Sequence, residues 1–460
     1  MKKNRSRRFG WAYTAAIIGA GLAALLLLAP ACRSEKAPAG ADVAAAAPEV
    51  KAAAPANVKT GLEVLLEKRL DLIKGKRIGL ITNPSAVDRR LRSAIDLLRE
   101  ADGAKLAALY GPEHGVRGDA QAGEYVPYYI DKQYGLPVFS LYGPSMKPQA
   151  GMLKGIDEYM RSFDTTHKDK KLAPSMTKDI DVLLYDIQDV GTRVYTYEAT
   201  MAYAMEACAE AGLDFIVLDR PNPITGAIME GPVLEYPEFS SFVGIYPVPL
   251  RFGLTIGELA LLYNDRFLKK KARLTVIPME GYKRDLWFDQ TGLPWVAPSP
   301  NIPTLETASV YPGQVFFEGT NVSEGRGTTR PFEYFGAPWI DGHALAAALN
   351  DLKAAGVIFR EQWFTPTFSK FKGELCGGCQ IHVIDRNAYR PLETTLRIIA
   401  VLRKLYPTNF QFHNSYFDKI MGTASVRVAL EKGTDAKSIA EGWKMGLASF
   451  EEMRKPYLLY

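Results

Sequence analysis

The sequence predicts an α/β fold built around a mainly parallel β-sheet, and three observations support this prediction. Short continuous apolar runs recur along the chain, each of a length that suits one strand buried on both faces. Segments with helical periodicity separate these runs, as crossover helices do between parallel strands. Polar side chains gather where several of the runs end, and open parallel sheets bind their ligands at that edge.

The apolar runs mark the expected strands, and the periodic segments between them mark the expected helices. Strands are expected at 77–82, 106–110, 137–142, 181–186, 214–219 and 273–278. Apolar residues at helical spacing predict helices at 61–74, 91–101, 151–162, from after 193 to about 211, and at 256–267. A Pro-rich join at 294–303 leads to a second region, with helices expected at 342–355, 391–405 and 435–453 and strands near 380–385. We therefore expect domains at 59–293 and 294–460.

The first 58 residues differ in composition from the rest of the chain. Five basic residues and then an uncharged apolar run at 11–29 precede Cys32, as in a secretory signal. The run Leu28-Ala-Pro-Ala-Cys32 resembles a bacterial lipoprotein processing site, at which the cysteine is lipidated; an uncleaved membrane anchor and plain secretion are the alternatives. All three predict export to the cell envelope or periplasm. We expect a leader at 1–32 and an Ala/Pro-rich tether at 33–58.

The net charge argues against nucleic acid as a partner. The whole chain carries a formal charge of +5, and the predicted leader supplies all of it, so the remaining residues are neutral overall. A neutral body lacks the basic footprint that nucleic-acid binding requires.

Polar clusters follow three of the predicted strands. Their members are Glu113 and His114, then Asp186, Gln188, Asp189 and Arg193, and finally Asp219, Arg220 and Asn222. Because parallel strands end at one edge of the sheet, these clusters predict a functional site there. Glu113 and His114 adjoin each other in a Gly-rich loop after a strand, which suits proton transfer; alternatively, Glu113 caps the next element and His114 is a structural loop histidine. Alternatively, one or two of the acids cap the helices that follow, which Asp does well.

A second candidate loop lies in the C-terminal region. It contains Asn321, Glu324, Arg326, Arg330 and Glu333 among glycines and hydroxyl residues. The two arginines either bind a carboxylate of a ligand bidentately or pair with the two glutamates structurally.

The remaining motifs exclude several classes of protein. No G-x-G-x-x-G, no P-loop and no G-x-S-x-G is present, and the five histidines lack metal-ligand spacing, so we expect neither cofactor nor metal. Ser175-Met-Thr-Lys178 and Lys59-Thr60-Gly61 match penicilloyl-transfer motifs in the wrong order. Cys376-Gly-Gly-Cys379 has too few ligands for zinc, and an oxidising compartment makes a local disulfide plausible. Cys208 lies on an apolar helical face and is expected in the core.

Six motifs, in order along the chain, together resemble the exo-lytic β-N-acetylmuramidases of bacterial cell-wall turnover. They are Gly79-Leu-Ile-Thr-Asn-Pro84, Gly111-Pro-Glu-His-Gly115, Asp186-Ile-Gln-Asp-Val-Gly-Thr-Arg193, Leu218-Asp-Arg-Pro-Asn-Pro223, Glu230-Gly231 and Glu318-Gly-Thr-Asn-Val-Ser-Glu-Gly-Arg-Gly-Thr328. The resemblance covers about residue 60 to Tyr460. It implies a Rossmann-like N-terminal domain without a nucleotide, a smaller α/β (α+β) C-terminal domain, and an active cleft between them. It also implies release of N-acetylmuramic acid from the non-reducing end of peptidoglycan fragments, such as muropeptides or the muramyl-glucosamine disaccharide.

The same resemblance makes Glu113 the candidate catalytic residue, and glycoside hydrolysis requires it to act as general acid/base. His114, Asp186 and Asp189 would tune Glu113 or orient water. The second catalytic role falls either to Asp186 or Asp189, or to the 2-acetamido oxygen of the substrate. Arg326 and Arg330, with Arg193, are expected to hold the lactyl carboxylate of the muramic sugar. The remaining expected substrate-binding residues are Asn83, Gln188, Asp219, Arg220, Asn222, Asn321 and Glu324. A non-catalytic envelope lipoprotein that binds muropeptides or another sugar acid is the alternative function.

Overall fold

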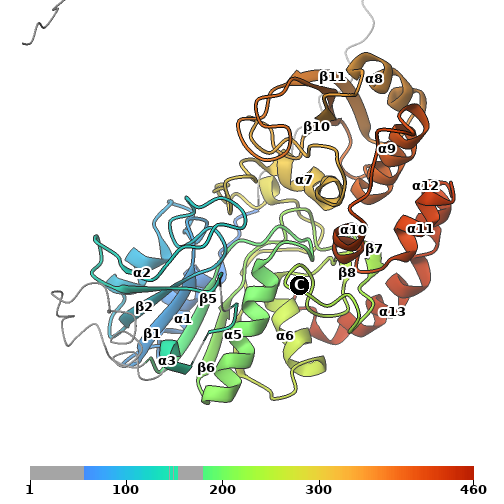
Figure 1. Ribbon diagram of the computed structural model, residues 1–460. Coiled ribbons are helices and arrows are strands. Elements are labelled where there is room, and N and C mark those ends of the chain that lie inside the picture. Colours follow the sequence, from blue (N-terminus) through green and yellow to red (C-terminus); the bar gives the residue numbers. More distant parts are fainter. Residues whose placement is uncertain (1–55, 144–145, 149, 154–179) are drawn as a thin grey trace, which may run out of the picture. The chain divides into compact units, whose positions relative to one another are not determined.

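A seven-stranded sheet forms the centre of the N-terminal half of the chain (Figure 1). The computed structural model describes residues 56–143, 146–148, 150–153 and 180–460. Neighbouring strands lie in the order β3-β4-β2-β1-β5-β6-β9, and every neighbouring pair is parallel except β3–β4. The strands are β1 (Arg77–Thr82), β2 (Lys105–Gly111), β3 (Tyr129–Ile130), β4 (Pro137–Ser140), β5 (Val182–Asp186), β6 (Asp214–Leu218) and β9 (Arg273–Ile277). The predicted mainly parallel α/β fold is therefore confirmed.

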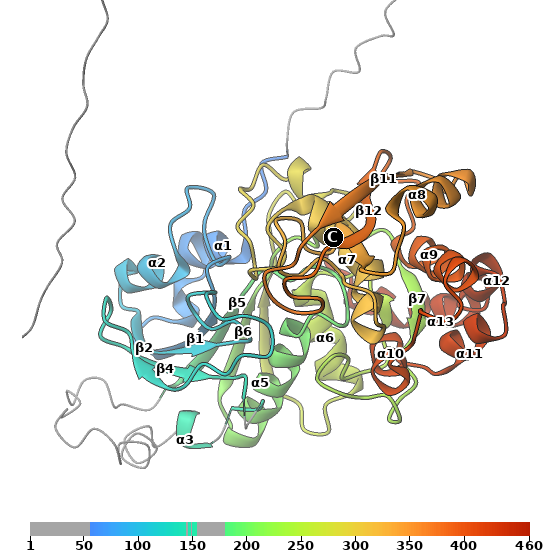
Figure 2. The same cartoon turned by 45° about the horizontal axis from the view of Figure 1, so that its top comes forward.

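Helices cover both faces of this sheet (Figures 1 and 2). Strand β5 shows the division, because successive residues of a strand point to opposite faces. Val182 and Leu184 join the core beneath α1 (Gly61–Lys68) and α2 (Ala94–Glu100). Leu183 and Tyr185 join the larger core beneath α5 (Tyr197–Ala211) and α6 (Ile256–Arg266). Both faces are thus buried, which explains why the strands are continuously apolar.

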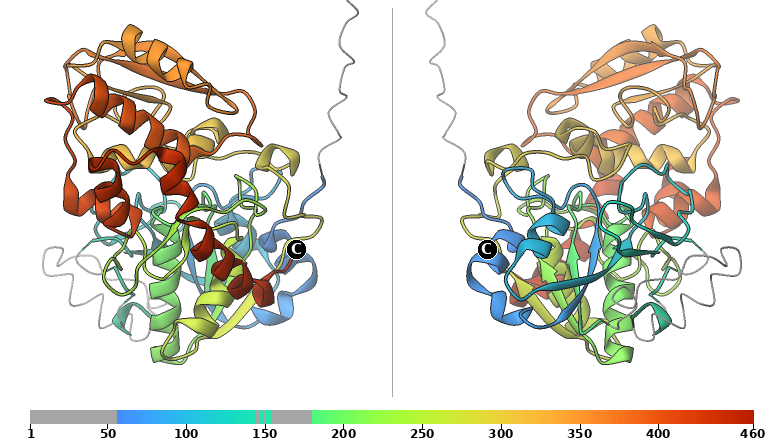
Figure 3. Two further views of the ribbon diagram at one scale, coloured as in Figure 1. Left: turned by 90° about the vertical axis from the view of Figure 1, so that its right-hand side faces the viewer. Right: turned by 90° about the vertical axis from the view of Figure 1, so that its left-hand side faces the viewer.

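The C-terminal region is mostly helical and contains a small antiparallel sheet in the order β10-β12-β11. Its strands are β10 (Tyr334–Ala337), β11 (Val357–Phe364) and β12 (Cys376–Val383). Its helices are α7 (Leu305–Gln314), α8 (Gly342–Asp351), α9 (Pro391–Leu405), α10 (Asn414–Met421), α11 (Ser425–Glu431), α12 (Ala436–Glu441) and α13 (Lys444–Arg454). The final residues return to the first domain beside α1 (Figure 3), where the Tyr460 hydroxyl donates to Asp219 Oδ2 at 2.7 Å.

Several short elements complete the described chain. A two-stranded antiparallel pair joins β7 (Glu230–Val233) to β8 (Pro249–Arg251), and α3 spans Ala150–Leu153. Short 3₁₀ helices lie at Leu70–Leu72, Phe288–Gln290, Val315–Gly319 and Lys455–Tyr457. No helix among the described residues is both long enough and apolar enough to cross a bilayer.

Most of the predicted elements occur, and the differences lie at their ends. The helix predicted at 61–74 stops at Lys68 and continues as a 3₁₀ turn, and the helix predicted at 435–453 is divided between α12 and α13. Strands β3, β7, β8, β10 and β11 and helices α7, α10 and α11 were not predicted. The leader with Cys32, the tether up to residue 55, positions 154–162 of a predicted helix and the Ser175–Lys178 motif lie outside the described residues. The domain boundary at 293/294 stays a prediction.

The cysteine pair does not form the local disulfide that its spacing made plausible. Cys376 and Cys379 both lie on strand β12, and both thiols are free and buried. Strand residues three positions apart point to opposite faces with Cα atoms about 10 Å apart, beyond the reach of a disulfide. Cys208 is buried in the core, as predicted.

Candidate active site

A cavity lies where loops of the sheet domain meet the C-terminal region. Its volume is about 550 Å³, within the range of small-ligand sites. The sheet domain contributes Glu113 and His114 after β2, and the segment Val194–Thr196 before α5. The C-terminal region contributes residues from α7, from the loop around Arg326, and from α10. The cavity is therefore built from the strand-end edge that the sequence singled out and from a partner region opposite it.

Glu113 is held on the cavity wall by neutral donors. It follows β2 directly, and its side chain is 8% exposed. The Thr196 hydroxyl donates to Oε2 at 2.7 Å, and the backbone N–H of Gly123 donates to Oε1 at 3.0 Å. Burial, together with the charge of Glu113 and a hydrogen bond to it, raises the pKa of Tyr142 to about 12, so this phenol remains a donor. Two neutral donors, Thr196 and Gly123, therefore orient the carboxyl group of Glu113 without an ion-pair partner.

His114 adjoins Glu113 in a left-handed backbone conformation, with φ of 73°. Its Nδ1 lies 2.8 Å from the carbonyl oxygen of Ala120. A carbonyl oxygen only accepts, so Nδ1 carries the proton and Nε2 is left as an acceptor in the neutral ring. Burial lowers the pKa of His114, and nearby Glu113 raises it by a smaller amount. The net lowering of the pKa favours the neutral ring.

The opposite wall holds a closed cluster of four charged side chains. Arg326 donates to Glu318 at 2.8 Å, and its Nε lies 3.6 Å from Glu324. Lys370 donates to the same Glu324 at 3.0 Å and to the carbonyl oxygens of Phe317 and Val322. Two cations and two carboxylates therefore neutralise each other within this cluster.

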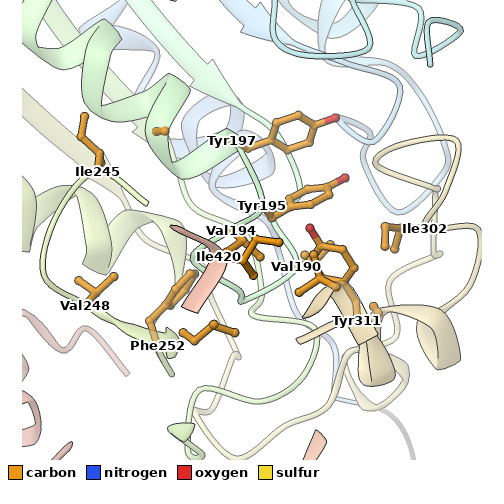
Figure 4. Close-up of a cluster of buried hydrophobic side chains, with 14 of the residues drawn as sticks. Val190, Val194, Tyr195, Tyr197, Ile245, Val248, Phe252, Ile302, Tyr311 and Ile420 are labelled. Carbon is orange, nitrogen blue, oxygen red and sulfur yellow. The ribbon is translucent and has the colours of Figure 1, made fainter. Parts of the chain in front are cut away.

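The floor of the cavity is apolar and aromatic. It includes Val194, Tyr195, Ile302, Tyr311 and Ile420, all drawn in Figure 4. The rings of Tyr195 and Tyr311 meet edge to face with centroids 5.7 Å apart. Such a surface suits the apolar face of a sugar ring, while the walls offer polar partners for its hydroxyl groups.

Of the residues predicted from the sequence, the structure brings Glu113, His114, Glu324 and Arg326 together at this cavity. The other predicted site residues do not line it. Their side chains are already bonded to other groups of the protein, most of them inside the fold and two at its surface.

The predicted catalytic Asp186 and the predicted ligand Arg220 form a buried ion pair with each other. Arg220 Nη2 donates to Asp186 Oδ2 at 3.0 Å and Nε donates to Oδ1 at 2.5 Å, and Asp186 has no exposed surface. Asp219 caps α6, because its Oδ1 accepts from the N–H of Gly257 at 2.7 Å and its Oδ2 from the Thr255 hydroxyl. This is the capping alternative that the strand-end acids left open.

Asp189 and Arg193 are also buried in the fold. Asp189 Oδ1 accepts from the N–H of Gly191 at 2.7 Å, and burial raises the pKa of Asp189 to about 7. Arg193 has no exposed surface and donates to four backbone carbonyls. The expected roles of Asp189 in catalysis and of Arg193 in binding the lactyl group are not supported by these positions.

The five remaining polar residues serve local structure. Asn83 donates to Tyr197 and to the carbonyl of Pro298, and Gln188 donates to the carbonyls of Asp189 and Pro221. Asn222 donates to the carbonyl of Leu254. Two further residues lie at the surface: Asn321 bonds the backbone of Asn409 and Gln411, and Arg330 pairs with Glu333.

Several residues of the cavity were not predicted, namely Tyr142, Thr196, Glu318, Lys370, Tyr416 and Lys419. Thr196 carries a detectable signal, since it is the N-cap of α5 and follows a strand-end motif. Glu318 begins one of the six motifs. Lys370 and Lys419 carry no local signal, because they lie on a loop and a helix whose positions depend on tertiary packing.

Comparisons with known proteins assign the family. The family model described as exo-beta-N-acetylmuramidase NamZ, N-terminal, matches residues 78–164 and 160–306, and its C-terminal counterpart matches 309–460. The peptidoglycan beta-N-acetylmuramidase NamZ of Bacillus subtilis is 50% identical over 383 residues, which cover 83% of this chain and 86% of that protein.

Two solved structures share the fold. Both are DUF1343 family proteins from Bacteroides fragilis, with 40% and 31% sequence identity and TM-scores of 0.76 and 0.68. Each match covers 88% of this chain and 99% of the other. The matched motifs, the two family models and the identity over most of the chain show that this chain belongs to the NamZ family of exo-beta-N-acetylmuramidases.

Proposed function

We propose that this chain is a glycoside hydrolase that releases N-acetylmuramic acid from the non-reducing end of peptidoglycan fragments. Its Bacillus subtilis relative is a peptidoglycan beta-N-acetylmuramidase. The single observation that carries the proposal is the position of Glu113: a carboxyl group on the wall of a cavity of about 550 Å³, oriented by Thr196 and Gly123. A sugar in this cavity would meet an aromatic floor and a proton donor together.

Glu113 acts as the general acid in this proposal. It donates its proton to the glycosidic oxygen as the bond from that oxygen to the anomeric carbon breaks, and water finally supplies the hydroxyl group on that carbon. Thr196 and the backbone N–H of Gly123 orient the carboxyl group on the cavity wall and also stabilise the carboxylate that remains after the transfer. His114, neutral and with Nε2 as an acceptor, is a partner for a substrate hydroxyl group or for water.

The second catalytic role does not fall to Asp186 or Asp189, since neither lines the cavity. Glu318 and Glu324 are the other carboxylates on the cavity wall, and both are bonded to the cations of the closed cluster. The 2-acetamido oxygen of the substrate is the alternative nucleophile and needs no protein carboxylate at the anomeric carbon.

We further propose that the enzyme is exported and works in the cell envelope, held to a membrane by a lipid on Cys32. The sequence supports this with its basic and apolar leader, its lipoprotein-like processing site and the Ala/Pro-rich segment that follows. A tethered hydrolase would act on wall fragments close to the membrane. Radiolabelled palmitate incorporated by the wild-type chain but not by Cys32→Ser tests the lipid anchor.

Incubation with the muramyl-glucosamine disaccharide tests the activity. We expect equal amounts of free N-acetylmuramic acid and N-acetylglucosamine, with no release of lactate or peptide. Glu113→Gln should lower the rate of release by about 10²–10⁴-fold while leaving the unfolding midpoint unchanged. Binding of the disaccharide without turnover by the wild-type chain would instead favour a muropeptide-binding lipoprotein.

A further inference from the structure

Two ionisable side chains on the wall of the cavity, Glu113 and Lys419, have no ion-pair partner among the described residues. Arg326, Lys370, Glu318 and Glu324 neutralise one another in the closed cluster. Glu113 has only neutral donors around it, and no described carboxylate lies within 4.0 Å of Lys419 Nζ. Among the described residues of the cavity wall, Lys419 is therefore the cation whose charge no carboxylate already neutralises.

One short segment, Arg193 to Thr196, bonds both to the end of the helix that carries Lys419 and to Glu113. Lys419 is in the last turn of α10, and the two residues after it, Ile420 and Met421, offer their carbonyls to Arg193 at 3.0 and 2.8 Å. Three residues after Arg193, Thr196 bonds Glu113. The segment from Arg193 to Thr196 therefore fixes the end of α10 and the carboxyl group of Glu113 relative to each other.

A simpler role for Lys419 is a favourable interaction with the C-terminal end of the helix dipole. That role would apply equally to Lys404, an exposed lysine in the last turn of α9 that does not line the cavity. What separates the two lysines is the cavity, so a comparison between them isolates a role in ligand binding.

We propose that Lys419 is the specificity-determining cation that recognises the lactyl carboxylate, the group that distinguishes N-acetylmuramic acid from N-acetylglucosamine. This assignment rests on the proposed function. It replaces the arginines that the sequence suggested: Arg193 is buried away from the cavity, Arg330 lies at the surface, and Arg326 shares its charge between two glutamates. The ε-ammonium of Lys419 carries three donors on a flexible stem and is free to turn toward a carboxylate in the cavity.

Two chromogenic probes test the proposal, 4-nitrophenyl β-N-acetylmuraminide with its free lactyl carboxylate and the same compound with a primary amide in place of that carboxylate. The wild-type enzyme should prefer the acid. Lys419→Gln should lower the acid-to-amide ratio of kcat/KM roughly tenfold, mainly through KM. Lys419→Arg should restore most of the preference, and Lys404→Gln should keep the wild-type ratio.

An acid-to-amide ratio that is the same in Lys419→Gln as in the wild type would overturn the proposal, as would a loss of preference in Lys404→Gln. Failure of the proposed function gives a different result, since the wild type would then hydrolyse neither probe. In that case the affinities of the wild type and Lys419→Gln for free N-acetylmuramic acid, measured by calorimetry, decide the role of Lys419. Equal affinities would overturn it.

Discussion

Replacement of Arg193 by methionine should destabilise the protein strongly, because Arg193 joins helix α10 to the sheet domain from inside the core. Its Nη1 donates to the carbonyls of Pro232 and Val248 at 3.1 and 2.9 Å, and its Nη2 to those of Ile420 and Met421. Gly422, which ends α10 with φ of 73°, allows this approach, since a Cβ there would lie 2.7 Å from Nη2.

The size of the effect follows from opposing contributions. Four buried carbonyls lose a charged donor, and hydrogen bonds to charged groups are worth about 1.5–3 kcal/mol each. Burying the charge of Arg193 costs free energy in the wild type, because burial lowers the pKa of Arg193 to about 10. The methionine variant does not pay this desolvation cost, which offsets part of the loss. We therefore expect a net loss of about 3–5 kcal/mol in the free energy of unfolding.

Urea unfolding followed by circular dichroism measures this loss. Arg92→Met is the control, because Arg92 and its partner Glu100 are 44% and 64% exposed, so the loss of this surface pair should cost less than about 1 kcal/mol. The reasoning is refuted if Arg193→Met unfolds at the wild-type urea concentration while KM for the muraminide rises. That result would return Arg193 to the substrate-binding role that its motif suggested.

Three further predictions concern buried groups. Burial raises the pKa of Glu198 from 4.5 to about 8, so between these pH values the native state keeps a proton that the unfolded chain has lost. The free energy of unfolding should therefore fall as the pH rises through this window. Glu198→Gln should make that fall less steep in thermal unfolding scans. Arg220→Met should cost about 3–5 kcal/mol by leaving the buried Asp186 unpaired, whereas Arg77→Met, in a pair one third exposed, should cost under about 1 kcal/mol in urea unfolding. Cys376 and Cys379 should both be alkylated by iodoacetamide in the unfolded, unreduced protein, and mass spectrometry showing them linked would contradict the strand geometry.

The sequence predicted the sheet well because its signals are local. Strand β1 has the predicted bounds, and each of the other predicted strands of the parallel sheet lies within about two residues of its expected ends. A continuously apolar strand must be buried on both faces, which predicts a sheet covered by helices on each side. Glu113 was singled out by two local signals, its place in a Gly-rich loop after a strand and the family motif that contains it, and the structure places it on the cavity.

The other strand-end acids show the limit of this reasoning. Asp186 and Asp219 occupy the same kind of position as Glu113, yet one pairs with Arg220 and the other caps α6. The difference lies in what tertiary structure places beside each of them, and no residue spacing encodes it. Lys419 was missed because it reaches the cavity only through the packing of α10 against the segment that contains Arg193.

The role of Glu113 is tested most directly by the dependence of rate on the leaving group. A general acid matters most when the leaving group is a poor one, such as the sugar hydroxyl of the natural disaccharide, and little when it is 4-nitrophenolate. We predict that Glu113→Gln lowers kcat on the muramyl-glucosamine disaccharide by about 10²–10⁴-fold and lowers it far less on 4-nitrophenyl β-N-acetylmuraminide. A folded Glu113→Gln variant that loses less than about tenfold on the disaccharide, or loses equally on both substrates, would contradict the assignment of Glu113 as proton donor.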